Sequence, residues 1–302
     1  MAVRNNIQTR EDFSKARTKA RMQSLLSALQ WKNTSLLSFY EVTKLVKPKS
    51  ETYRGVIPIE VSKILGSEGR YHDFTLAFYP KKDMLRSRWQ SIDDAHLKQV
   101  TLPPISVYKL SDYYFVRDGN HRVSVAKMQG VEFIDAEVVE LDSEIYLEPG
   151  MTTATLRKMV VEYEKKRVIA EYHIDEILDL KTVKFSSPGM YPELINHIMV
   201  HKYYMNEKNE KPLIFRDAAE NWYQNIYYPI YRQIQEDGLL KHFPGKTYGD
   251  LYLWIVRRWD DLKATEGGQG SIQDAARDMK LSVGSTSLKR FFSRVKKLFT
   301  ER

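Results

Sequence analysis

The sequence contains no cysteine among its 302 residues. This absence excludes disulfide bonds, thiolate metal sites and thiol nucleophiles, so any chemistry must use oxygen and nitrogen groups. Long apolar runs are also missing, since no stretch approaches the roughly 18 apolar residues of a membrane span. Residues 1–10 lack the apolar core of a signal peptide. We therefore expect a cytoplasmic protein with no transmembrane segment.

The net charge of +8 comes from 47 Lys and Arg against 39 Asp and Glu, and it is concentrated at the two ends. Residues 1–50 carry 10 basic and 3 acidic side chains, and residues 271–302 carry 8 and 3, which leaves −4 for residues 51–270. The basic ends are either solvated faces or contacts for DNA or another acidic partner. The length is ample for a core and favours two domains.

Hydrophobic periodicity predicts helices and strands in the first half of the chain. The expected helices there are 11–29, 36–45 and 83–99, with a linker at 44–50 that contains Pro48 and a turn at 66–69. The expected strands are 56–61, 105–110, 114–117 and 133–141, of which 105–110 and 114–117 form a hairpin. Beyond Pro149 the sequence is mostly helical, with expected segments at 151–170, 171–180, 190–206, 212–236, 247–264 and 271–300.

One strand runs directly into a short helix through Asp118, Gly119, Asn120, His121 and Arg122, and Gly130 follows as a left-handed C-cap. The free N–H groups and partial positive charge of a helix start bind anions. Gly119 lets a ligand approach the backbone, and Arg122 can form a bidentate contact with a phosphate. This predicts a phosphate cradle. The alternative is that Asp118 or Asn120 is an ordinary N-cap and Arg122 a surface residue.

Three segments resemble the N-terminal domain of the ParB and sulfiredoxin superfamily. They are the Ile-Pro-Ile box in 57–64, the Pro-Pro-Ile run in 102–105 and the sequence YFVRDGNHRVSVAKMQG in 114–130. The resemblance covers about residues 53–142. It implies an α+β domain in which the helix start holds nucleotide phosphates.

The departures from this pattern are informative. Asn120 stands where sulfiredoxins have their catalytic cysteine, so sulfinic acid reduction is excluded. ParB proteins carry Glu-Arg-Arg-type residues after the glycine, whereas this chain has His121 and Arg122. Relatives with a D-G-x-H-R version are small-molecule kinases or nucleotidases.

The resemblance thus implies a nucleoside triphosphate, ATP or CTP, with Mg²⁺, and it leaves nucleotide hydrolysis or phosphate transfer open. The implied binding residues at the motif are Gly119, Asn120, His121 and Arg122. The candidate catalytic residues are Asp118, His121 and Glu60.

The turn after the first box, 66–70, is where relatives place a second wall of the pocket. Arg70 is the main candidate there for a second phosphate contact, with Ser67 and Glu68 as weaker ones. The alternative is an ordinary surface turn. The helix around Arg88 and Trp89 is either a lid or a solvated face with the tryptophan in the core.

Two other patterns have competing interpretations. His197 and His201 are four residues apart on one helical face, a spacing that suits a metal, but no third ligand is evident and we predict no metal site. The aromatic segments 221–231 and 248–259 are more typical of core than of base stacking. They also resemble the helical region that accompanies this ParB-like domain in a group of bacterial proteins.

The tail, 271–302, has a helix-turn-helix pattern with basic residues that would suit DNA. Its second helix also has a wide apolar stripe made of Leu288, Phe291, Phe292, Val295, Leu298 and Phe299. Such a stripe must be buried against the body, another copy or a membrane surface.

We therefore predict an α+β fold with four parts. These are a basic helical extension in 1–50, a ParB/sulfiredoxin-like domain in 51–145, an α-helical domain in 146–270 and basic amphipathic helices in 271–302. The leading function is binding of a nucleotide or phosphorylated small molecule. The alternatives are a DNA-binding, partition-like or transcriptional regulator with a nucleotide switch, and a non-catalytic interaction protein. The sequence leaves the formation of a homo-oligomer open.

Overall fold

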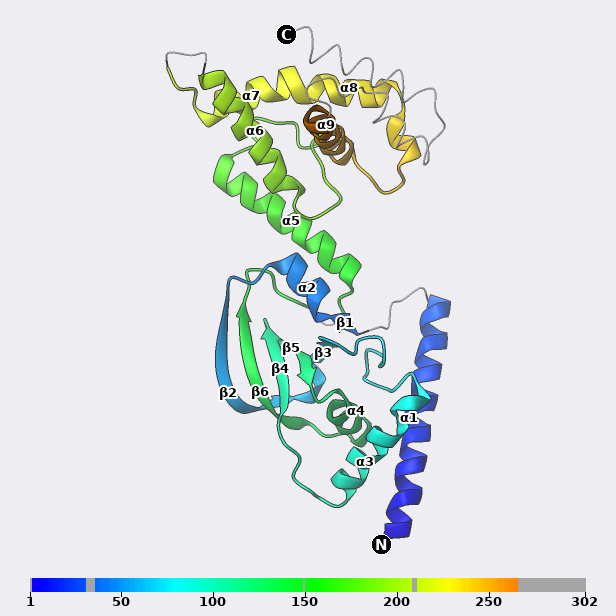
Figure 1. Cartoon of the computed structure of the whole chain (residues 1–302). Coiled ribbons are helices and arrows are strands. Elements are labelled where there is room, and N and C mark those ends of the chain that lie inside the picture. The colour runs from blue at the N-terminus through cyan, green and yellow to red at the C-terminus, as the bar shows by residue number, and fades with distance from the viewer. Residues whose placement is uncertain (1, 31–35, 149, 208–210, 266–302) are drawn as a thin grey trace. The chain divides into compact units, whose positions relative to one another are not determined.

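The computed structural model describes residues 2–30, 36–148, 150–207 and 211–265 (Figure 1). The chain divides into two compact units between Leu156 and Arg157, and each unit is described by itself. Within the described ranges, no helix is both long enough and apolar enough to cross a membrane. The predicted tail helices in 271–302 lie outside the described residues.

The first unit is built on a six-stranded mixed sheet with the strand order β1-β3-β5-β4-β6-β2. The strands are β1 Leu37–Ser38, β2 Ser50–Glu60, β3 Ile64–Ser67, β4 Ile105–Leu110, β5 Tyr113–Asp118 and β6 Phe133–Asp142. β1, β3 and β5 run parallel, β4 and β5 form the predicted antiparallel hairpin, and β6 pairs with β4 in parallel and with β2 in antiparallel fashion. The predicted mixed fold of strands and helices is confirmed.

Helices cover both faces of this sheet. They are α1 Ala2–Gln30, α2 Phe39–Val46, α3 Arg86–Leu97 and α4 Asn120–Gln129. Phe39 of α2 stacks on Tyr108 at 4.1 Å between ring centroids. Val123 of α4 is buried with Val107 and Val116. Because neighbouring strand residues point to opposite faces, α2 and α4 lie on opposite sides of the sheet.

A buried relay of hydrogen bonds ties α3 to α4 and to the loop before α3. The indole Nε1 of Trp89 donates to Ser124 Oγ at 2.9 Å, and the Ser124 hydroxyl donates to the carbonyl of Phe78 at 2.6 Å. All three residues are fully buried. Phe13 of α1 packs edge-on against Trp89 at 5.6 Å between centroids, so α1 is part of this core.

Several predicted elements of the first unit differ from the structure. The helix predicted at 11–29 starts at Ala2, and the strand predicted at 56–61 is β2, Ser50–Glu60. Gly66 and Ser67 belong to β3 rather than to a turn. Gly66 is needed for close packing, because a Cβ there would lie 2.4 Å from Phe115 Cδ1 and 2.5 Å from the carbonyl oxygen of Leu37. The predicted helix at 36–45 starts only at Phe39, because Leu37 and Ser38 pair with β3.

The second unit is helical, as predicted. Its elements are α5 Thr153–Tyr172, which begins in the first unit, α6 Met190–Asn206, α7 Phe215–Trp222, a π-helical turn Tyr223–Tyr227, α8 Tyr228–Glu236 and α9 Tyr248–Thr265. Trp222, Tyr227 and Tyr252 contact one another in its core, with ring centroids 4.9–5.6 Å apart. The aromatic segments therefore supply core. Residues 174–177 form a turn rather than the predicted helix, because His173, at φ 51°, ends α5.

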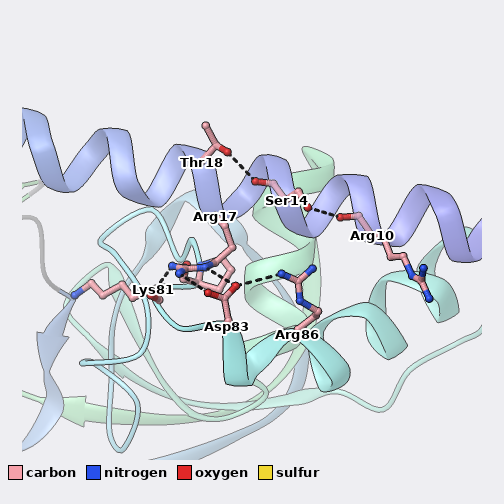
Figure 2. Close-up of polar contacts among 8 residues, drawn as sticks. Arg10, Ser14, Arg17, Thr18, Lys81, Asp83 and Arg86 are labelled. Atoms are coloured by element: carbon pink, nitrogen blue, oxygen red, sulfur yellow. Dashed lines mark hydrogen bonds and ion pairs between the residues drawn. The ribbon is translucent and has the colours of Figure 1, made fainter.

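Arg17 anchors α1 to the loop before α3, as Figure 2 shows. Its side chain is 12% exposed and donates to the carbonyls of Pro80, at 3.2 Å, and Lys81, and its Nη2 lies 3.0 Å from Asp83 Oδ2. Arg10, on the same helix, points away from this group (Figure 2).

Replacing Arg17 by Ala should lower the free energy of unfolding by about 1–2 kcal/mol, because two loop carbonyls lose a charged donor. Thermal and urea unfolding measure the change. Arg10→Ala is the matched control, since its side chain has no partner in the described part of the chain, and it should shift stability by less than about 0.5 kcal/mol. Equal effects of the two variants would contradict the anchoring role.

A carboxylate is buried where α1, α3 and α4 meet. Asp93 is fully buried, and its Oδ1 accepts from Gln129 Nε2 at 2.7 Å. The same Gln129 nitrogen lies 3.4 Å from Asp12 Oδ2. Asp93 Oδ2 has no partner among the described residues. Burial, with a smaller contribution from the charge of Asp12, raises the pKa of Asp93 to about 6.

Asp93→Asn should therefore stabilise the protein at neutral pH. The folded-state pKa lies above the unfolded value of about 3.9, so the charged form destabilises the fold above pH 6 and the neutral form below pH 4 does not. The variant should gain about 2–3 kcal/mol at pH 7.5 and nothing at pH 4. Asp94→Asn, one residue along α3, is the control and should show no such gain. A gain independent of pH would count against a buried charge at Asp93.

Candidate functional site

A pocket of about 360 Å³ opens where β5 meets α4. Its walls come from the loop after β3, from α3 and from the start of α4. The lining residues are Gly69, Arg70, Asp73, Arg88, Ile92, Arg117, Asp118, Gly119, Asn120, His121 and Arg122. The structure thus brings together the five motif residues of the predicted phosphate cradle and Arg70, which is 48 residues earlier in the sequence.

Gly119 makes the sharp turn from β5 into α4. Its φ is +101°, and a Cβ there would lie 2.4 Å from Ile105 Cγ2, so a side chain fits neither the backbone nor the space. In the described structure no side chain caps the start of α4. Since the first intrahelical bond runs from Val123 N–H to the Gly119 carbonyl, the N–H groups ahead of it are left for a ligand.

Two buried polar side chains stand at this helix start. Asn120 is 7% exposed and His121 is 6% exposed. Asn120 Oδ1 and His121 Nδ1 have no hydrogen-bond partner in the described residues. The imidazole ring packs edge-on against Phe74 at 5.5 Å between centroids. A buried polar atom without a partner costs about 1–3 kcal/mol, so both atoms favour a ligand that supplies one.

His121 is neutral at physiological pH. Burial lowers its pKa to about 4, and the charges of Arg88 and Arg70 contribute in the same direction. A neutral imidazole donates one hydrogen bond and accepts another. In this structure His121 can therefore act as a neutral hydrogen-bond donor or acceptor, but not as a cation.

The guanidinium of Arg122 already has hydrogen-bond partners within the first unit. Its Nη1 donates to the carbonyls of Pro103 and Pro104, the latter at 2.8 Å, and its Nη2 lies 2.5 Å from Asp118 Oδ2. The side chain is 12% exposed. The guanidinium therefore fastens the start of α4 to the segment before β4. This differs from the free bidentate contact predicted from the motif, because the proline carbonyls lie 18 and 19 residues away in sequence.

The other cations of the pocket differ in their freedom. Arg70 pairs with Asp73 at 3.1 Å, and Asp73 also accepts from Lys82 at 2.7 Å. Burial opposes ionisation of Asp73, but the hydrogen bonds from Lys82 and Arg70 outweigh it and lower its pKa. Arg88 is exposed and makes no side-chain hydrogen bond or ion pair within the described ranges. Arg88 is thus the freest cation of the pocket, a role that the sequence motif does not reveal.

Two predicted site residues have other roles. Ser67 is fully buried, donates to the carbonyl of Val116 at 3.3 Å and accepts from the Arg70 N–H at 3.2 Å, so it shapes the loop that carries Arg70. Glu60 is the last residue of β2, and its Oε1 accepts from Lys63 Nζ at 2.7 Å. Among the described residues, it is not one of those that line the pocket.

The histidine pair and the basic N-terminus have local explanations as well. His201 Nε2 lies 2.9 Å from Asn221 Oδ1, and His197 Nδ1 lies 3.4 Å from the Tyr252 hydroxyl. No group of three His, Asp or Glu side chains among the described residues is placed to hold a metal. On α1, Arg17 is engaged as above, and Lys19 lies over the Tyr79 ring at 5.4 Å.

Comparisons with known proteins find similar structures only at low scores. No family model and no curated protein matches the chain. A sulfiredoxin structure from Arabidopsis thaliana is 16% identical, with a TM-score of 0.22, and the match covers 28% of this chain and 82% of that one. Two structures of a pNOB8-like ParB N-domain are 12% and 14% identical, each with a TM-score of 0.22, over 83% and 84% of this chain and 98% and 92% of theirs.

Proposed function

We propose that the pocket at the start of α4 binds the phosphate groups of a nucleoside triphosphate, ATP or CTP, with Mg²⁺. One observation carries this proposal: Asn120 and His121 line the pocket, are more than nine-tenths buried, and each has a polar atom without a partner in the described residues. They adjoin an uncapped helix start, which favours anions.

The groups around the pocket suit a polyphosphate. The N–H groups of the first turn of α4 and the His121 imidazole can donate to phosphate oxygens. The Asn120 amide can do the same when it turns its nitrogen toward the ligand. Arg88 supplies a cation from α3 that has no ion pair to give up in the described chain, and Arg70 supplies a second from the loop after β3. Phosphate groups contacted in this way gain charge-assisted hydrogen bonds.

The carboxylates of the pocket indicate where Mg²⁺ would be held. Asp73 has both oxygens engaged, one by Lys82 and one by Arg70. Asp118 is 67% exposed, and only its Oδ2 is used, by Arg122. Asp118 is therefore the residue that fits a cation bound together with phosphate oxygens, and the ion would neutralise part of the phosphate charge.

Arg88→Ala and Asn120→Ala should each weaken binding of Mg·ATP, Mg·CTP and inorganic tripolyphosphate at least about tenfold, because each removes a group that meets the phosphates. Asn120→Ala should leave the melting temperature unchanged or higher, since it removes a buried polar atom without a partner. Isothermal titration calorimetry and thermal unfolding measure the two effects.

Arg21→Ala is the matched control for charge, because Arg21 is an exposed arginine of α1 that makes no side-chain hydrogen bond or ion pair in the described chain. It should leave all three affinities within about twofold. Arg122→Ala is unsuitable as the main variant, since it also releases the Pro103 and Pro104 carbonyls. Absence of binding by the wild-type protein, or binding that Arg88→Ala and Asn120→Ala leave unchanged, would overturn the proposal.

A further inference from the structure

The pocket lies at an edge where three parallel strands end side by side. Ser38 of β1 is level with Ser67 of β3, and Ser67 is level with Val116 of β5. The chain leaves β1 into α2 on one face of the sheet and leaves β5 into α4 on the other face. Ligands of open α/β sheets bind at such reversals, in the crevice beyond the carboxyl ends of the strands. The end of β3 therefore has α2 on one side of the sheet and α4, with the pocket, on the other.

On the α2 side of the sheet, Tyr40 of α2 and Glu68, the residue after β3, present an exposed aromatic ring and a carboxylate. Tyr40 is 61% exposed, and its hydroxyl donates to Glu68 Oε1 at 3.0 Å. Glu68 immediately precedes Gly69 and Arg70, which line the pocket, and its N–H donates to the Val116 carbonyl at 2.9 Å. Because two residues of extended chain span at most about 7 Å, the Cα atom of Glu68 lies within about 7 Å of the Cα atom of Arg70, a distance that one nucleotide can bridge.

Arg117 links the pocket to the aromatic side chains on the α2 side of the sheet. It lines the pocket, and its guanidinium carbon lies 5.8 Å from the centroid of the Tyr108 ring. Tyr108 in turn stacks on Phe39, the residue before Tyr40. A series of ring contacts thus leads from Arg117 in the pocket through Tyr108 and the buried Phe39 to Tyr40, whose own ring is exposed. Nucleobases stack on surfaces of this kind.

We propose that Tyr40 and Glu68 hold the base of the nucleotide whose phosphates lie at the start of α4, an inference that rests on the proposed function. The Tyr40 ring stacks on the base. Glu68 Oε1 accepts from the Tyr40 hydroxyl, and Oε2, which has no hydrogen-bond partner among the described residues, accepts from an exocyclic amino group of the base. The site therefore selects adenine or cytosine over uracil, which presents a carbonyl oxygen in place of the amino group of cytosine.

Calorimetric titration of the full chain with Mg²⁺ complexes of ATP, CTP, UTP and inorganic tripolyphosphate tests this inference. Tyr40→Ala should weaken ATP and CTP binding about tenfold through loss of stacking and leave tripolyphosphate within about twofold. Glu68→Gln should weaken ATP and CTP similarly and should narrow or reverse the preference over UTP, because an amide nitrogen replaces the accepting oxygen. Tyr40→Phe, which keeps the ring, should retain ATP and CTP binding within about threefold.

The matched control is a second tyrosine with the same surroundings. Tyr53 of β2 is 62% exposed and donates to Glu137 Oε1 at 3.1 Å, at the opposite edge of the sheet. Tyr53→Ala should leave every affinity unchanged. If tripolyphosphate and nucleotides all fail to bind, the proposed function itself is wrong. If tripolyphosphate binds but Tyr40→Ala and Glu68→Gln leave ATP, CTP and UTP affinities unchanged, only the base site is wrong.

Discussion

The buried hydrogen bonds from Trp89 through Ser124 to the Phe78 carbonyl determine the geometry of the candidate site. Ser124 lies one helical turn after Asn120, and Trp89 directly follows Arg88, so these two bonds set the cation on α3 against the start of α4. Both polar groups are satisfied inside an apolar core, where hydrogen bonds have little competition from water. The same core includes Phe13, which makes α1 a structural part of the first unit rather than a separate appendage.

The sequence predicts those parts of the site that depend on local pattern. The β4–β5 hairpin, the turn at Gly119 and the start of α4 follow from strand alternation, helical spacing and a glycine between them. Contacts between distant segments do not follow from such patterns. Arg88 reaches the pocket because Trp89 is buried, and Arg122 is occupied by proline carbonyls that fold back onto it. Glu60, a candidate catalytic residue that the resemblance implies, is at the end of β2, and the sheet order places β2 three strands away from β5.

Unpartnered polar atoms identify a binding site only in the right setting. Asp93 Oδ2 also has no partner in the described structure, yet Asp93 is fully buried among packed helices and does not line the pocket. Asn120 and His121, by contrast, line a pocket at an uncapped helix start, and arginine side chains line the same pocket. A ligand in the pocket can reach Asn120 Oδ1 and His121 Nδ1 and form hydrogen bonds with them. The buried carboxylate of Asp93 is out of reach of such a ligand, and only its protonation can change.

The edge strand β2 has features that oppose aggregation between copies of the protein. β2 is eleven residues long and is the last strand in the sheet order, so its outer side offers backbone groups to any other extended chain. Pro58 removes one N–H from the strand, and the register shift between Tyr53 and Gly55 interrupts its regular pleat. These two irregularities protect the longest strand of the described sheet against edge-to-edge aggregation, without a covering helix.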